Sequence, residues 1–165
     1  MNVRLEHFMA EKDKKKTTPT IQNRKATFDY LIEETYEAGI ALQGTEVKSI
    51  REGQVSFVDS FTYMDNGEIL LKDLYIKEFK FGSYNNHEAT RTRKLLLKKK
   101  EIEEIDILLH QKGYTVVPLK IYFKNGFAKI LIGLAKGKKK HDKRDSIAER
   151  DSQRELKRDF KTSQF

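Results

Sequence analysis

The chain has 165 residues, enough for one small domain with flanking segments, and its lack of cysteine excludes disulfides and thiolate metal sites. Its 33 lysines and arginines exceed its 25 acidic residues, and the net charge of +8 favours an acidic partner, either nucleic acid or an anionic membrane surface. Because no apolar run approaches the ~20 residues that cross a bilayer and Met1–Thr20 is too polar for a signal peptide, we expect a cytoplasmic protein.

Residues 1–22 are predicted to form a flexible basic leader. The segment E-K-D-K-K-K-T-T-P-T carries many charges and Pro19, which oppose packed structure. Its lysines could touch RNA, but the usual behaviour of chain termini favours a solvated leader.

The body of the chain begins with a strand-like segment. The alternation of Phe28, Tyr30 and Ile32 predicts a strand over Ala26–Tyr36. Glu37–Gly39 is then predicted to turn the chain before a short buried strand.

A short helix and a meander of strands follow. The helix is expected to begin near Thr45 and to end at Gly53. Val55–Tyr63 and Glu68–Phe79 are predicted strands, and the turn Asp65–Gly67 joins them as a hairpin.

The principal helix lies in the second half of the chain, after a polar loop. Ile102, Ile105 and Leu109 recur at helical spacing and mark its apolar face, and Gly113 is the expected stop.

A second hairpin completes the body. Its strands are predicted at Tyr114–Phe123 and Phe127–Leu134, joined across Lys124–Gly126. Strands, one principal helix and more strands predict a mainly β fold with α, a small antiparallel Greek-key barrel of the oligonucleotide-binding (OB) type with inserted helices. We place this barrel at residues 23–135.

Residues 136–165 are predicted to form a basic C-terminal tail. Within Gly133–Arg144, read as G-L-A-K-G-K-K-K-H-D-K-R, the composition changes, and charged residues then leave no candidate core. Wound as a helix, Asp142–Lys161 has a basic arc but no apolar face, so we expect the tail to be disordered when free and to fold against phosphates. A merely solvated run of charge is the alternative. The basic arc contains Lys143, Ile147, Arg150, Arg154, Lys157, Arg158 and Lys161.

The sequence contains no evident catalytic constellation. The four histidines lie far apart without a metal-ligand spacing, and Gly133-x-x-x-Gly137 lacks the strand, turn and helix of a phosphate-binding loop. His87 and Glu88 could form an acid/base pair, but no third group accompanies them. We therefore expect no enzymatic activity, no metal and no cofactor.

Two features of the predicted barrel suggest a binding surface. Arg91, Arg93 and Lys94 precede an apolar triplet, and they either form a solvated helix entrance or grip phosphates. Lys129 interrupts an otherwise apolar strand face, which is typical of a surface that meets a partner.

Five segments of the chain share a further pattern. They are N-R-K-A at Asn23–Ala26, E-A-G-I-A-L-Q-G-T-E-V-K-S-I-R at Glu37–Arg51, T-R-T-R-K-L-L-L at Thr90–Leu97, G-Y-T-V-V-P-L at Gly113–Leu119, and the Gly133–Arg144 segment. In this order they resemble the SmpB family of proteins that bind transfer-messenger RNA, also called SsrA RNA.

The resemblance implies a non-enzymatic adaptor of trans-translation, the rescue of stalled ribosomes. The barrel would bind the tRNA-like domain of transfer-messenger RNA and stand in for the missing anticodon arm. The tail would enter the empty mRNA channel of the small subunit and become helical there. The implied partners are transfer-messenger RNA, the RNA of the small ribosomal subunit and, through the RNA, the elongation factor that delivers aminoacyl-tRNA. We expect a monomer with no membrane association.

The resemblance also implies site residues. The barrel residues assigned to transfer-messenger RNA are Asn23, Arg24, Glu37, Gln43, Lys48, Arg91, Arg93, Lys94, Leu96 and Lys129. The tail residues assigned to the ribosome and its decoding centre are Lys136, Lys138, Lys139, His141, Asp142, Lys143, Arg144, Ile147, Arg150 and Arg154. Glu37 is unexpected because a carboxylate repels phosphate, and it would instead accept hydrogen bonds from the amino or imino group of an exposed base. His141 would stack on a base or donate to a phosphate.

Two other functions stay open at this point. A general binder of single-stranded RNA or DNA would stack bases on exposed aromatic residues, and a metal-dependent nuclease would use aspartate and glutamate ligands. The chain also departs from the family pattern: Ser152 replaces a frequent bulky aromatic, Ala148 a frequent lysine, and Glu88-Ala89 a frequent Asp-Pro. The resemblance does not explain the leader before Asn23.

Overall fold

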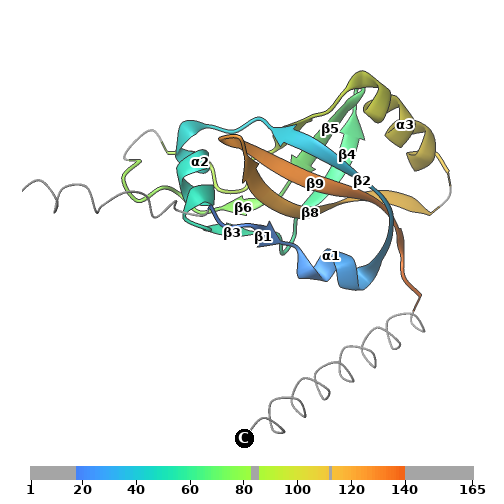
Figure 1. Ribbon diagram of the computed structural model, residues 1–165, viewed down its shortest axis with the longest axis horizontal. Coiled ribbons are helices and arrows are strands. Elements are labelled where there is room, and N and C mark those ends of the chain that lie inside the picture. The colour runs from blue at the N-terminus through green and yellow to red at the C-terminus, as the bar shows by residue number, and fades with distance from the viewer. Residues whose placement is uncertain (1–17, 83–85, 112, 140–165) are drawn as a thin grey trace, which may run out of the picture.

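The computed structural model describes residues 18–82, 86–111 and 113–139 (Figure 1). Most of the predicted leader and the tail from residue 140 onward, including the predicted site residues from His141 to Arg154, lie outside the described residues. The elements are β1 (Ile21–Gln22), α1 (Arg24–Asp29), β2 (Tyr30–Ile40), α2 (Gly44–Arg51), β3 (Val55–Ser56), β4 (Phe61–Asp65), β5 (Glu68–Lys72), β6 (Tyr75–Ile76), β7 (Arg93–Leu96), α3 (Lys99–Leu109), β8 (Tyr114–Lys124) and β9 (Phe127–Gly137).

An antiparallel sheet with the strand order β1-β8-β9-β2-β7-β5-β4 forms the body, and β3 pairs with β6 beside it. The end strand β4 curves back to contact β8, where the Thr62 hydroxyl donates to the Val116 carbonyl at 2.6 Å. This contact closes the sheet into a barrel. Because β2 lies between β9 and β7, the strand order is the crossing connectivity of a Greek key, as the sequence predicts.

Alternate residues of the strands fill the inside of the barrel, as the period of two requires. On the long hairpin, Ile121, Ile130 and Ile132 are fully buried, and Ala38 of β2 meets them. Ile105 of α3 joins the same core from one end of the barrel (Figure 1). The remaining core residues are Ile40, Ile50, Phe57, Ile69, Leu71, Leu74, Ile76, Leu95, Val116 and Leu134.

A second, smaller core lies outside the barrel, under α1. Ala26 of this helix packs with Val117, Leu119 and Ala135, which point outward from β8 and β9. Asn23 begins the helix, since its Oδ1 accepts from the Ala26 backbone N–H at 3.1 Å. The outer face of the long strands is therefore covered at one end.

The structure corrects two sequence predictions in this region. The predicted strand over Ala26–Tyr36 is helical through Asp29 and extended only from Tyr30. The predicted turn at Glu37–Gly39 does not exist, because β2 continues through it to Ile40. Gly39 is instead opposite Leu96 of β7, where a Cβ on residue 39 would come within 3.3 Å of the Leu96 Cβ.

The hairpins and the two longer helices are where the sequence places them. Asn66 and Gly67, like Asn125 and Gly126, have positive φ angles between 49° and 82°, the conformation of a type I′ turn. α2 and α3 match the predicted helices. The two predicted long strands around the first hairpin are each divided, because Val55–Tyr63 contains β3 and the start of β4, and Glu68–Phe79 contains β5 and β6.

Regular structure extends past both predicted ends of the barrel. β1 pairs Ile21 with Ile121, within the stretch predicted as leader, and β9 continues to Gly137. Beyond β9, the Lys138 backbone N–H donates to the Asp29 carbonyl at 2.9 Å. Among the described residues, no helix is long and apolar enough to span a bilayer.

Candidate nucleic-acid interface

The half of the outer sheet face that α1 leaves uncovered carries a mixed polar and apolar surface. Its residues alternate with the buried ones on β2, β8 and β9, so they point outward. We call this surface the Glu37 face; it consists of Glu37, Gly39, Leu96, Lys120, Tyr122, Lys124, Phe127, Lys129 and Leu131.

Glu37 lies at the centre of this face and is held by its neighbours. Its carboxylate accepts hydrogen bonds from the Tyr122 hydroxyl and from Lys124 Nζ, the latter at 3.0 and 3.1 Å. The bond from Tyr122, the contacts with Lys124 and the charge of Lys129 lower the pKa of Glu37 from its ordinary value. Burial and the bond to Glu37 raise the pKa of Tyr122 to about 12. Glu37 is therefore an ionised acceptor and Tyr122 a protonated donor at neutral pH.

Three lysines surround this one carboxylate. Lys120 lies with Nζ 5.3 Å from the centre of the Tyr122 ring, a cation–π contact, and Lys129 is opposite both Gly39 and Tyr122 in the sheet. The Glu37 face is thus basic overall, with a single acceptor in its middle. Phosphates would meet the lysines, and the free lone pairs of Glu37 would meet a base edge.

An apolar groove of about 350 Å³ begins at Gly39, two residues along β2 from Glu37. Leu96 and Phe127 line it and are 52% and 71% exposed, and Lys129 stands at its edge. Gly39 leaves the floor of the groove without a side chain. An unstacked base fits such a groove, because a flat apolar ring gains from contact with Leu96 and Phe127.

Arg93 is not on the surface. Its side chain is 0% exposed, and Nε donates to Glu46 Oε1 at 2.7 Å while the other nitrogens donate to the carbonyls of Leu74, Arg91 and Ala89. With its donors occupied and buried, Arg93 has no atom available for a phosphate. Its role is to hold the barrel together, contrary to the sequence-based assignment.

Arg91 shares the same buried carboxylate. Its Nε and one terminal nitrogen donate to Glu46 at 2.9 and 2.5 Å, and Glu46 also accepts from the Gln43 backbone N–H at 2.6 Å. Burial raises the pKa of Glu46, but the bonds from Arg91 and Gln43 and the charge of Arg93 outweigh burial, so the net shift is downward. This network ties the start of α2 to the segment before β7.

Gln43 and Lys48 lie on α2, and both are exposed. Gln43 is the residue before the first turn, in a capping box with Glu46. Lys48 Nζ lies 5.0 Å from the centre of the Phe79 ring. Lys94 is exposed on β7 but pairs with Glu68 of β5, so part of its charge is neutralised.

Asn23 is a structural residue in this chain. Its side chain is nearly buried, Oδ1 caps α1, and Nδ2 donates to the Pro118 carbonyl at 2.9 Å. The neighbouring Arg24 is exposed. Asn23 therefore positions α1, and it lies at the β8 edge of the sheet, where the preceding Gln22 is paired with Lys120 of the Glu37 face.

The three predicted tail residues within the described part of the chain belong to the barrel end. Lys136 lies in β9, and its Nζ is 3.0 Å from Glu33 and 4.1 Å from the centre of the Tyr114 ring. The hydrogen bond from Tyr114 and that from Lys136 lower the pKa of Glu33. Lys138 donates through Nζ to the Thr27 carbonyl at 3.3 Å, and Lys139 is exposed beyond it.

The sequence-based site lacks six residues of the Glu37 face: Gly39, Lys120, Tyr122, Lys124, Phe127 and Leu131. A signal for three of them exists, because Lys120, Tyr122 and Lys124 alternate with apolar residues along one strand and must share a face. These residues come close to Glu37 because β9 pairs with both β8 and β2. Local sequence does not reveal that pairing.

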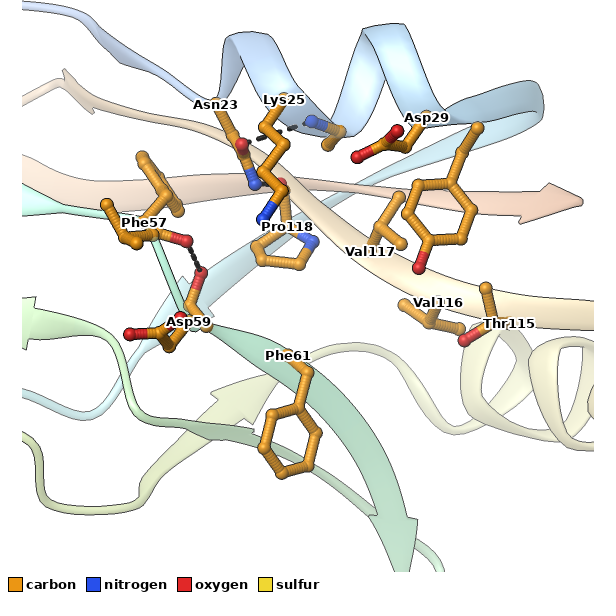
Figure 2. A pocket seen from close by; sticks show the side chains of 14 residues that line it. Asn23, Lys25, Asp29, Phe57, Asp59, Phe61, Thr115, Val116, Val117 and Pro118 are labelled. Carbon is orange, nitrogen blue, oxygen red and sulfur yellow. Dashed lines mark hydrogen bonds between the residues drawn. The ribbon is translucent and has the colours of Figure 1, made fainter. Parts of the chain in front are cut away.

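A second pocket of about 320 Å³ lies between α1 and the segment before β4 (Figure 2). Figure 2 shows Lys25 and Asp29 on its α1 side, with Asp59 and Phe61 across from them. Two carboxylates against one lysine make it a poor site for phosphate. In the part of the chain that the structure describes, no group of three histidine, aspartate or glutamate residues could hold a metal ion.

Comparison with known proteins identifies the family. A family model described as SmpB protein matches residues 20–162. The SsrA-binding protein of Bacillus subtilis (strain 168) is 52% identical over 143 residues, 87% of this chain and 92% of the relative. The SsrA-binding protein of Halalkalibacterium halodurans is 57% identical over 140 residues, 85% of this chain and 91% of the relative.

A solved structure gives the same result. A chain in "tmRNA-SmpB: a journey to the center of the bacterial ribosome" superposes with a TM-score of 0.63 at 50% sequence identity, covering 78% of this chain and 94% of that one. With a family model that spans most of its length and relatives more than half identical to it, this chain belongs to the SmpB family.

Proposed function

We propose that this protein is the transfer-messenger RNA-binding adaptor of trans-translation, which rescues stalled ribosomes. The observation that carries the proposal is membership of a family whose members are named SsrA-binding proteins, together with the likeness to a chain solved as tmRNA-SmpB with the ribosome. The partners are then transfer-messenger RNA and the small ribosomal subunit. The elongation factor acts with the protein through the RNA.

The barrel holds the tRNA-like domain through the Glu37 face. Lys120, Lys124 and Lys129 attract its phosphates, and the groove beside Leu96 receives an unstacked base whose amino or imino group donates to Glu37. Because Tyr122 and Lys124 already fix the Glu37 carboxylate, little ordering is needed when RNA binds. The bound barrel occupies the position of the missing anticodon arm.

The three parts of the chain divide the work. The leader lies before β1, the barrel binds RNA, and the basic tail beyond Lys139 enters the empty mRNA channel, where ribosomal phosphates let it fold as a helix. His141, Asp142, Lys143, Arg144, Ile147, Arg150 and Arg154 act there. The function requires RNA binding and no catalytic step, and it places the protein in the cytoplasm with the ribosome.

The test compares the full chain with a chain ended after Lys139. This end point keeps β9 and both bonds from Lys138 to α1. Each protein is titrated, at one fixed salt concentration, with a tRNA-like fragment of transfer-messenger RNA and with an unstructured RNA of equal length. We expect both proteins to prefer the folded fragment strongly and only the full chain to support tagging. Equal binding of the two RNAs would favour the general single-strand binder instead.

A further inference from the structure

An exposed aromatic pair lies on the turn Lys77–Gly82, outside the Glu37 face. Phe81 is 76% exposed, and its ring centre lies 5.7 Å from that of the half-buried Phe79, at an angle of 65°. Single exposed hydrophobic residues are common on protein surfaces. These two rings are neighbours and together form a continuous exposed apolar patch.

Lysines frame these rings. Lys48 Nζ lies 5.0 Å from the Phe79 centre and Lys80 Nζ 5.8 Å from the Phe81 centre, while Lys77 is exposed at the start of the turn. Glu78 is the one carboxylate within the turn. Aromatic faces interleaved with a surplus of positive charge are what single-stranded nucleic acid binds, since bases stack and phosphates pair with ammonium groups.

The turn is held rigid from behind by Asn86. Its Nδ2 donates to the Phe79 carbonyl at 2.8 Å, and its Oδ1 accepts from the Phe79 N–H at 3.1 Å. Gly82 closes the turn by donating to the same Phe79 carbonyl at 2.8 Å. A Cβ on Gly82 would lie 2.8 Å from the Asn86 amide, so a larger residue there would displace the Asn86 side chain. The backbone that carries the two rings is thereby held by hydrogen bonds.

His87, the residue after Asn86, connects this turn to the barrel and to α2. His87 is buried, with Nε2 3.0 Å from the Ile76 carbonyl and Nδ1 2.9 Å from the Thr45 hydroxyl of α2. Because a carbonyl only accepts, Nε2 carries the proton and Nδ1 accepts from Thr45. The turn and α2 consequently form one rigid unit.

A hollow of about 450 Å³ lies beside the rings. Phe79 and Lys80 form one side, and Tyr75, which is 45% exposed, contributes a further aromatic face. The polar Asn86 and the small Ala89 line the rest with Lys77 and Glu78. The hollow has room for a nucleobase.

α2 connects this region with the Glu37 face. Arg51, one turn after Lys48, lies with its guanidinium carbon 5.5 Å from the centre of the Phe123 ring. Phe123 precedes Lys124, which pairs with Glu37. Lys124, Arg51 and Lys48 therefore place cationic side chains beside Glu37, Phe123 and Phe79 in turn.

We propose that the Phe79–Phe81 turn is a stacking platform for an unpaired nucleotide of the RNA that the Glu37 face holds. Phe81 and Phe79 contact the base, and Lys48 and Lys80 contact the phosphates on either side of it. The proposal rests on the proposed function for the identity of that RNA. It extends the RNA-binding surface to a loop and to an aromatic pair that the sequence-based site does not include.

The first experiment measures the affinity of Phe81→Ala for the tRNA-like fragment. Base–aromatic stacking accounts for roughly a tenfold difference in affinity on alanine substitution, so we expect about tenfold weaker binding. The matched control is Phe61→Ala, an exposed phenylalanine on β4 beside the acidic pocket, for which we expect no change beyond twofold. Lys80→Ala is expected to reduce the slope of log affinity against log salt by about one.

A second experiment observes the stacking directly. The chain has no tryptophan, so Phe81→Trp introduces a single fluorophore at the platform. We expect its emission to be quenched as RNA is added, whereas Phe61→Trp, bound to the same RNA, keeps its emission.

The outcomes separate this proposal from the proposed function. If Phe81→Ala binds RNA as tightly as the unchanged protein and Phe81→Trp is not quenched, the turn does not bind RNA. The proposal is then wrong, and the exposed rings would instead suit a protein partner. If the unchanged protein binds folded and unstructured RNA alike while Phe81→Trp is quenched by both, the platform stands and the adaptor function fails.

Discussion

Glu37 and Glu46 carry the same functional group in opposite settings. Glu37 is partly exposed and keeps lone pairs for a ligand, while Glu46 is fully buried and surrounded by donors from Arg91, Arg93 and the Gln43 backbone. Both have lowered pKa values, through different contacts. The first residue therefore serves recognition and the second serves stability.

Replacing Glu46→Gln should lower the free energy of unfolding by about 3–5 kcal/mol, because it leaves the buried guanidinium of Arg93 without a counter-charge. The pKa of Glu46 is lower in the folded protein than its ordinary value of 4.5. Its contribution is therefore fully present above that pH and is lost as the pH falls below it.

Urea unfolding at pH 7 and pH 4 measures this effect. The difference between Glu46→Gln and the unchanged protein should narrow at the lower pH, and the exposed Glu52→Gln on the same helix should behave like the unchanged protein at both. An equally stable Glu46→Gln protein at pH 7 would contradict the assignment.

Replacing Tyr122→Phe should change the pH dependence of RNA binding more than the affinity at neutral pH. Without the hydroxyl, the largest influence that lowers the pKa of Glu37 is removed, so the pKa rises and the carboxylate is protonated at a higher pH. Affinity for the tRNA-like fragment, measured from pH 7.5 to pH 4.5 at fixed salt, should thus decline at higher pH than in the unchanged protein. Tyr63→Phe on β4 is the control, and coincident pH profiles would contradict the role of Tyr122.

For single residues, the sequence indicated which side chains matter more reliably than it indicated what surrounds each of them in the fold. The basic run left Arg93 open between a solvated helix entrance and a phosphate contact, and the family resemblance assigned it to the RNA. Glu46, the partner of Arg93, is distant in the chain, and only the pairing of β7 with the body brings the two together. Lys129 needs no such partner, and its half-buried position on the outer face of β9 agrees with the alternation of its strand.

Elements fixed by local chemistry were predictable, and those fixed by distant packing were not. The turns at Asn66-Gly67 and Asn125-Gly126 follow from residues that adopt positive φ. α1 was read as a strand because Phe28 and Tyr30 alternate with polar residues. The available signal was Asn23, whose cap on Ala26 begins the helix.

The packing of Ile32 of β2 and Leu119 of β8 in the outer core under α1 depends on Gly133 of β9. A Cβ there would lie 3.0 Å from both Ile32 and Leu119, which belong to the outer core and its surroundings. Gly133→Ala should therefore lower the free energy of unfolding by about 1–3 kcal/mol through overpacking.

Gly137→Ala is the matched control, because nothing lies within 4 Å of its added Cβ and it belongs to the same strand. Thermal unfolding of both proteins gives the comparison. A Gly133→Ala protein as stable as Gly137→Ala would show that Ile32 and Leu119 can move aside without cost.

For the whole molecule, the proposed division between barrel and tail predicts that RNA binding and tagging are separable. On the helical wheel, Arg150 and Arg154 lie on the basic arc of the tail. Reversing both charges, Arg150→Glu with Arg154→Glu, should leave binding of the tRNA-like fragment within about threefold and abolish tagging on stalled ribosomes, because only ribosomal phosphates require that arc.

The control neutralises the opposite arc with Asp151→Asn and Glu155→Gln, and it should keep both activities. Collapse of RNA binding in the arginine variant would instead place the tail in the first encounter with the RNA. Filter binding and an in vitro tagging assay provide the two measurements.

The closing contact of the barrel has a consequence for its motions. Every other pair of neighbouring barrel strands is joined by a ladder of backbone hydrogen bonds, but β4 meets β8 through side chains, including the bond from Thr62 to the Val116 carbonyl. Opening this seam breaks no ladder, so amides of β4 should exchange with deuterium sooner than those of β9, and Thr62→Val should accelerate them further. We expect the barrel to open first along this β4–β8 seam, which would convert it into an open, curved sheet.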